Sequence, residues 1–235
     1  MREHGFSLGK RVVAELLGTA GLVAAVVGSG IMAERLSGGN LAIALLANTI
    51  ATAAALLAII LTLGGISGAH LNPVVSLADA MAGGLRWSEA AVYSVAQIAG
   101  GVCGVVLANL MFGMRAVAMS QHVRSGWGQG LGEFVATFGL LAVIWGCSRT
   151  RAESTPVAVA AYIAGAYWFT SSTSFANPAV TIARSLTDTF AGIRAWDVPM
   201  FMCAQICGAA AATVLFAWLV PLRTKDANLV EGKVR

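Results

Sequence analysis

The sequence predicts an all-α membrane protein in which six spanning helices and two short re-entrant half-helices form an inverted repeat. Three observations carry this prediction: an apolar composition, six long apolar windows, and motifs that occur twice in the same order. Of the 235 residues, 57% are hydrophobic and 11% are charged, and the mean hydropathy is +0.77. Soluble domains contain about 25% charged residues, so we expect lipid rather than water to be the main solvent of this chain.

Six apolar windows are long enough to cross a bilayer, because a helix rises ~1.5 Å per residue and the hydrocarbon layer is about 30 Å thick. Two further apolar pieces begin with Pro and are too short to cross, which is typical of half-membrane helices. The whole chain, 1–235, is then one transmembrane domain. The six crossings are expected at 12–33, 41–64, 88–112, 130–148, 156–173 and 197–221, and the half-helices at 73–83 and 178–187.

The distribution of basic residues predicts the orientation. With both termini in the cytoplasm, that side collects ten of the fifteen Lys and Arg residues, which satisfies the positive-inside bias. We therefore expect a multi-pass protein of the cell (inner or plasma) membrane. The net charge of +4 is explained by basic residues that face anionic lipid, so the bilayer is the expected partner and no nucleic acid is needed. The cysteines lie in or beside apolar windows, where packing is a better explanation than a metal site.

Three features occur twice in the same order, which predicts an internal repeat. They are Glu15 with Thr19, Asn72-Pro73-Val74 and Gln97-Ile98 in the first half, and Glu133 with Thr137, Asn177-Pro178-Ala179 and Gln205-Ile206 in the second. Each half contains three crossings, an odd number, so the second half lies upside down relative to the first. We place the repeats at about 10–113 and 130–222, joined by a loop at about 114–129.

The two Asn-Pro motifs are expected to line a pore. Asn is a favoured N-cap and Pro a favoured first helical residue, so each motif begins a helix, and the inverted repeat brings both starts to mid-membrane. Non-helical backbone at that depth must be buried in protein or line a watery cavity. Each half-helix directs roughly half a positive charge at this point, which disfavours cations, while the Asn amides can donate hydrogen bonds to a passing oxygen. This chemistry suits small neutral solutes.

With Ser-Gly-Ala-His-Leu-Asn-Pro-Val at 67–74 and Ser-Phe-Ala-Asn-Pro-Ala-Val at 174–180, the chain resembles the aquaporin and glycerol-facilitator (major intrinsic protein) family. The resemblance covers roughly residues 10–222 and includes the paired Glu residues and both Gln-containing helices. It implies an aquaporin-like fold and a homotetramer. The residues themselves show no nucleophile beside a base, no His-rich metal spacing and no phosphate loop, so we expect neither an enzyme nor a cofactor.

The selectivity filter is expected to differ from the usual pattern. In this family four positions line the narrowest point, toward the outer side, and carried over by spacing they are Thr52, Gly165, Ser174 and Val180. The family normally has Arg where Val180 stands and commonly has an aromatic residue where Thr52 stands, so a wider and less polar constriction is expected. Arg184 lies one turn, ~6 Å, beyond Val180. It is expected either to guard the outer vestibule or to snorkel and pair with Asp188.

The run at 175–186 is similar to a bacterial subgroup associated with arsenic-resistance operons. This similarity implies passive conduction of neutral arsenicals, such as arsenous acid or methylated arsenicals, beside water and glycerol, because undissociated arsenous acid is a small neutral polyol. One alternative is a general glycerol and water facilitator without an arsenical role. Another is a proton-coupled secondary transporter that uses Glu15 and Glu133. We favour a structural role for both Glu residues, bracing the Asn-Pro loops, and a pore-lining position for His70.

Overall fold

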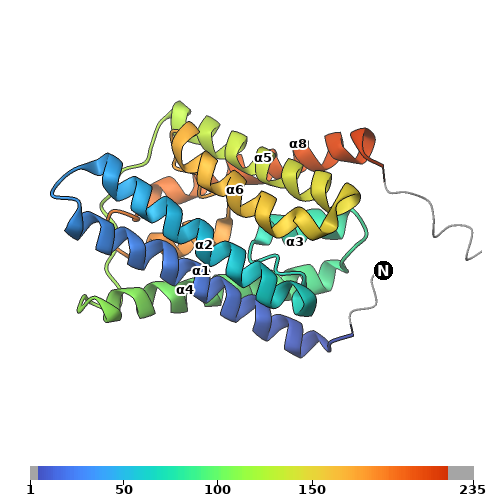
Figure 1. The fold of residues 1–235 in the computed structure, drawn as a ribbon, viewed down its shortest axis with the longest axis horizontal. Coiled ribbons are helices and arrows are strands. Elements are labelled where there is room, and N and C mark those ends of the chain that lie inside the picture. Colours follow the sequence, from blue (N-terminus) through green and yellow to red (C-terminus); the bar gives the residue numbers. More distant parts are fainter. Residues whose placement is uncertain (1–4, 222–235) are drawn as a thin grey trace, which may run out of the picture.

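The computed structural model describes residues 5–221, and within this range all regular structure is helical. The predicted fold class is confirmed: six long helices and two short ones follow in the expected order (Figure 1). The long helices are α1 (Leu8–Leu36), α2 (Leu41–Ser67), α4 (Trp87–Met111), α5 (Trp127–Thr150), α6 (Thr155–Phe169) and α8 (Val198–Leu219). The short helices are α3 (Pro73–Met81) and α7 (Pro178–Arg184), and 3₁₀ turns occur at Ala152–Ser154 and Ala195–Asp197.

Within the part of the chain that the structure describes, five segments are long and apolar enough to cross a membrane: α1, α2, α4, α5 and the stretch Ala195–Leu219, which contains α8. Helix α6 has 15 residues, or about 22 Å of rise, and ends four residues before the predicted window does. The chain leaves the helical conformation at Thr170, which is extended with φ −104° and ψ 139°, and Thr173 and Ser174 then have φ values of 60° and 52°. It then turns back toward the interior and leads into α7.

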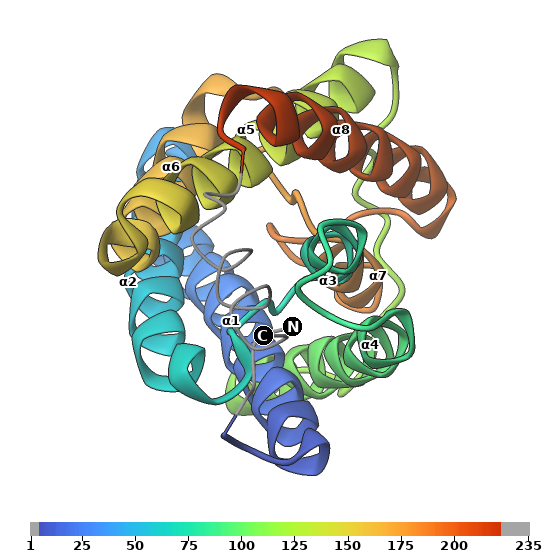
Figure 2. The same cartoon turned by 90° about the vertical axis from the view of Figure 1, so that its right-hand side faces the viewer.

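The helices of each half pack against one another, and the two short helices join the halves. Helix α1 contacts α2 and α4, and α5 contacts α6 and α8. The short helix α3 also contacts α8, while α7 contacts α4 and α1. Figure 2, a view along the bundle, shows α3 and α7 behind one another with long helices around them. The short helices are therefore enclosed by the bundle.

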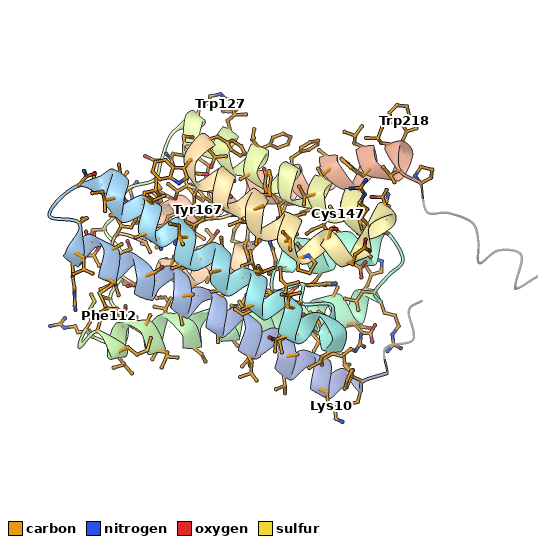
Figure 3. The ribbon with its side chains drawn as sticks, in the orientation of Figure 1. Lys10, Phe112, Trp127, Cys147, Tyr167 and Trp218 are labelled. Carbon is orange, nitrogen blue, oxygen red and sulfur yellow. The ribbon has the colours of Figure 1, made fainter. Side chains whose placement is uncertain are left out.

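The two ends of the bundle are distinguished by what they carry. Helix α1 begins and α8 ends at the same end, on the right of Figure 1, which we call the terminal end. The opposite end, the loop end, carries the connecting segment, residues 112–126, between α4 and α5. Trp218 at the terminal end and Trp127 at the loop end are 77% and 83% exposed (Figure 3), as aromatic residues at the two membrane interfaces are.

Close helix crossings recur at corresponding places in the two halves. A Cβ atom on Gly100 of α4 would collide with the carbonyl oxygen of Leu16 in α1, and one on Gly208 of α8 would collide with that of Phe134 in α5. Only glycine lets these backbones approach so closely. The glycines thus bring Glu15 and Glu133, one residue before each contact, close to Gln97 and Gln205.

Candidate functional site

Two non-helical segments, residues 68–72 and 173–177, lead into the short helices from the ends of α2 and α6. Five residues in them other than glycine have φ between 46° and 60°, a region that costs such residues about 1–3 kcal/mol unless the surroundings hold them there. They are Ala69, Leu71, Thr173, Ser174 and Ala176. Both segments therefore need specific partners.

Glu15 on α1 is the partner of the first segment. Its carboxylate accepts hydrogen bonds from the Ser67 hydroxyl at 2.6 Å and from the backbone N–H groups of His70 at 3.0 Å and Leu71 at 2.6 Å. The Gln97 amide donates to it at 2.7 Å. Glu15 is fully buried, and every one of these contacts satisfies a donor that would otherwise be buried without a partner.

Glu133 on α5 does the same for the second segment. Its carboxylate accepts hydrogen bonds from the backbone N–H groups of Phe175 and Ala176, both at 2.9 Å, and from the Gln205 amide at 2.6 Å. Gln205 also donates to the Thr181 hydroxyl at 2.9 Å, as Gln97 donates to that of Ser76 at 3.0 Å. The two Glu residues thus have the same neighbours in both halves.

The two Asn-Pro motifs meet and bind each other. Asn72 caps α3 by accepting from the N–H of Val74, and Asn177 caps α7 by accepting from those of Ala179 and Val180. The Nδ2 atom of Asn72 donates to the carbonyl of Ala176 at 2.7 Å, and that of Asn177 donates to the carbonyl of Leu71 at 2.7 Å. A primary amide has two N–H donors, so each Asn retains one that these bonds do not use.

A cavity of about 520 Å³ runs beside these amides and receives both Asn side chains. Its wall includes residues of α1, α2, α5 and α6 and both non-helical segments, among them Leu22, Leu56, Val159, Ile163 and Phe175. Most of the wall is apolar, and the polar lining residues include Thr52, Asn72, Ser174 and Asn177. This is the pattern of a site that orients a small solute through a few hydrogen bonds.

Three of the four predicted filter residues line this cavity: Thr52, Ser174 and Val180. The fourth, Gly165, is not among the lining residues. Gly165 is exposed on the outside of α6, because it lies two residues, about 200°, around the helix from Ile163 and Tyr167, which face the cavity. Tyr167 occupies the place expected for Gly165, with its hydroxyl 3.4 Å from that of Thr52.

Arg184, the last residue of α7, also lines the cavity. Its guanidinium carbon lies 3.4 Å from the centroid of the Phe175 ring, and its Nε donates to the carbonyl of Ala191. The alternative ion pair with Asp188 is absent: the Asp188 carboxylate instead accepts the backbone N–H of Gln121 at 2.9 Å. Arg184 therefore faces inward and not toward lipid.

Arg124, in the connecting segment, was not predicted. Its guanidinium donates to the carbonyls of Gly192 at 2.8 Å, Ser172 at 3.3 Å and Phe190 at 3.4 Å, and lies 5.0 Å from the centroid of Phe175. Burial lowers the pKa of Arg124 to about 10, so the side chain stays charged at neutral pH. Through the contact with Ser172 and Phe175 it holds the second non-helical segment in place on the side of the loop end.

At the terminal half of the cavity the charged lining residues are of a different kind. His70 lines the cavity, as predicted from its position before Asn72, and its ring lies 3.1 Å from the Ser76 hydroxyl and 3.8 Å from the Asp79 carboxylate. Glu153, between α5 and α6, lines the same half. Neither Glu15 nor Glu133 belongs to the lining. Over residues 5–221 there is also no cluster of His, Cys, Asp and Glu that could hold a metal.

Comparisons with known proteins agree with this geometry. The chain matches the Major intrinsic protein family over residues 3–170, and it is 53% identical over 215 residues to an aquaglyceroporin, AqpS, of Rhizobium meliloti (strain 1021), covering 92% of both chains. It is also 31% identical over 242 residues to a probable aquaporin, AqpM, of Archaeoglobus fulgidus, covering 91% of this chain and 98% of the relative.

Among solved structures, the X-ray structure of the aquaglyceroporin from Plasmodium falciparum has the same fold. It matches with a TM-score of 0.69 at 20% identity and covers 96% of this chain and 99% of its own. The family match ends before the second Asn-Pro motif, but the relatives extend across it. The chain belongs to the major intrinsic protein family, whose members are membrane channels and not enzymes.

Proposed function

We propose that this protein is a passive channel of the aquaglyceroporin type, which conducts water, glycerol and neutral arsenicals such as arsenous acid and methylated arsenicals. The observation that carries the proposal is the cavity beside Asn72 and Asn177, whose wall is mostly apolar and includes a few hydrogen-bonding groups. A neutral polyol can exchange its hydration for those groups one at a time. The aquaglyceroporin of Rhizobium meliloti, at 53% identity, supports the same class of solute.

The filter that we propose consists of Thr52, Tyr167, Ser174 and Val180, with Arg184 beyond it. Val180 stands where the family resemblance leads one to expect Arg, and an apolar residue of that size leaves more room and offers no hydrogen bond. For a solute with methyl groups, such as a methylated arsenical, the free-energy cost of entering this part of the pore is then smaller, because its desolvated methyl groups contact an apolar wall. This is the basis for including arsenicals.

A passive mechanism is favoured over proton coupling by the surroundings of the two buried carboxylates. The oxygens of Glu15 and Glu133 are occupied by backbone and Gln donors, and neither residue lines the cavity. A proton carrier has to exchange protons with water or with the substrate. The two residues therefore serve to hold the non-helical segments.

We further propose that the terminal end lies in the cytoplasm, in the cell membrane, and that the protein assembles as a homotetramer. The orientation follows from the basic residues collected on that side, among them Lys10 (Figure 3), Arg86 and Arg149. Within the subunit, residues 10–113 and 130–222 act as the inverted halves and 114–129 as their connection. The tetramer rests on the family resemblance.

The test is solute flux in proteoliposomes. Purified protein in vesicles is exposed to glycerol, urea and arsenous acid gradients, with and without an imposed proton gradient, beside protein-free vesicles. We expect flux that follows the solute gradient and ignores the proton gradient. Accumulation against a solute gradient would overturn the channel, whereas glycerol flux without arsenical flux would leave the alternative of a glycerol and water facilitator.

A further inference from the structure

The Arg184 side chain is a buried cation whose remaining donors point into the cavity. It is 3% exposed. A guanidinium carries five N–H donors, and within the described residues only that of Nε has an acceptor, the Ala191 carbonyl. The four donors on the two terminal nitrogens have none, although the side chain forms part of the cavity wall. They are available to a ligand.

A second cation approaches the same place without a counter-charge. Arg124 and Arg184 both lie over the ring of Phe175, at 5.0 Å and 3.4 Å from its centroid. Neither forms an ion pair within residues 5–221, where the pairs observed involve Arg11, Arg86, Arg194 and His70. Glu133, a buried carboxylate that does not line the cavity, accepts the N–H groups of the non-helical segment. Two positive charges thus share one aromatic ring with little compensation.

The neighbouring polar groups can also donate. The Ser174 hydroxyl is buried in the cavity wall and has no hydrogen-bond partner among residues 5–221. Within the same range the Tyr167 hydroxyl has only its long contact to Thr52. The acidic residues of the lining, Asp79 and Glu153, belong to the terminal half. The loop half of the cavity therefore combines donors and positive charge, which is the complement of an oxyanion.

We propose that the loop end of the cavity is a binding site for a small oxyanion, of which inorganic phosphate is the representative, and that its occupancy obstructs the passage of neutral solutes. Arg184 and Ser174 contact the anion, and Arg124 is a positioning residue that holds Phe175 and adds charge behind it. A desolvated guanidinium gains most from an anion with two or more oxygens, because it can donate to both in one plane. The block, but not the binding, rests on the proposed function.

The experiment measures glycerol flux into proteoliposomes while chloride is replaced by inorganic phosphate outside and inside at constant ionic strength and osmolality. We expect phosphate at millimolar concentrations to slow glycerol entry, with half-inhibition near ~10 mM, the range of a weak specific site. Arg184→Gln should raise that concentration about tenfold or more, which is ~1.4 kcal/mol. Arg115→Gln, which changes an exposed arginine of the same connecting segment, should leave it unchanged.

Binding is measured separately, by equilibrium dialysis of radioactive phosphate against the detergent-solubilised protein. Wild-type glycerol flux that does not respond to phosphate, together with no retained phosphate, overturns the site while leaving the channel intact. Equal sensitivity of wild type and Arg184→Gln also overturns it. If neither the wild type nor any variant conducts glycerol even in chloride, the proposed function fails instead. The dialysis measurement then still shows whether the protein binds phosphate. Arg184→Lys, which keeps one charge, should retain partial phosphate sensitivity if the variant is folded.

Discussion

The two Asn-Pro segments have almost the same supports but end in opposite chemistry. In the first, Glu15 and Gln97 hold the backbone before α3, and in the second Glu133 and Gln205 hold the backbone before α7. The terminal half of the cavity is lined by His70, just before α3, and by Asp79 within α3, whereas the loop half is lined by Arg184, the last residue of α7, against Phe175. The residues that are identical in the two halves thus position the backbone. Corresponding positions with different residues, His70 against Phe175 and Asp79 against Arg184, give the two ends of the cavity their different chemistry.

The largest effect should come from removing the shared supports. Glu133→Ala leaves two buried backbone N–H groups and one of the two N–H donors of the Gln205 amide without an acceptor, at about 1–3 kcal/mol for each donor. Glu15→Ala removes the corresponding acceptor in the first half. We expect both variants to lose most of their folded, monodisperse protein, as measured by size exclusion and thermal unfolding in detergent. Glu34→Ala, at an exposed position, is the control. If only one of the two variants loses folded protein, the two Glu residues are not equivalent supports.

Matching substitutions at the two cavity ends should then differ. Val180→Arg places a guanidinium beside Thr52 and Tyr167, and we expect it to lower glycerol and arsenical flux about tenfold or more, and water flux less, because the narrow part of the pore loses width. Val75 is the corresponding residue after Asn72. Val75→Arg can pair with Asp79, four residues on, and should reduce glycerol flux less. Stopped-flow light scattering measures both; equal loss of every permeant in Val180→Arg would indicate misfolding instead.

A smaller effect tests which residue of α6 belongs to the loop-end constriction. Tyr167→Ala removes a ring from the cavity wall and should raise the flux of a polyol larger than glycerol, such as erythritol, by roughly threefold, because pore width limits it. Gly165→Ala, on the outer face of α6, should leave the ratio of erythritol to glycerol flux unchanged. If Gly165→Ala changes this ratio and Tyr167→Ala does not, Gly165 and not Tyr167 belongs to the filter.

The smallest effect concerns His122 in the connecting segment. Its pKa lies below the ordinary value of 6.5, first because of burial and then because of the charges of Arg124 and Arg184. The folded protein thus disfavours the protonated imidazole, so stability is unaffected above pH 6.5 and falls as the pH drops below it. Arg184→Gln should raise the pKa of His122 slightly, as followed by NMR of labelled histidine. An unchanged pKa would show that the charge of Arg184 does not contribute to lowering it.

The sequence predicted the helices and the meeting of the two motifs because apolar length and an inverted repeat constrain both directly. Details that depend on tertiary contact were less accessible. The second short helix was expected to reach residue 187 but ends at Arg184, since the carbonyls of Ser185 and Leu186 accept backbone N–H groups of the connecting segment, at 3.0 Å each.

Two features of the cavity, the position of Gly165 outside its lining and the contacts of Arg124, differ from the expectation or were not expected, for different physical reasons. Gly165 was placed by a spacing that assumes a fixed path from the fifth crossing to the second Asn-Pro motif, and a rotation of two residues brings Tyr167 inward instead. Arg124 lies in a segment that has no counterpart in the other half, so neither periodicity nor repetition marks it. Only the contacts of its guanidinium with Ser172, Phe190 and Gly192 reveal its position.

The reciprocal bonds of Asn72 and Asn177 also constrain how this protein is made. Asn72 donates to Ala176, and Leu71 accepts from Asn177, so both bonds span more than a hundred positions of the chain. During synthesis the first re-entrant loop leaves the ribosome well before its partner exists. Until then the Asn72 amide and the Leu71 carbonyl must form their hydrogen bonds with water or with the insertion machinery. The two halves therefore complete their folding together, after the second Asn-Pro segment has been synthesised.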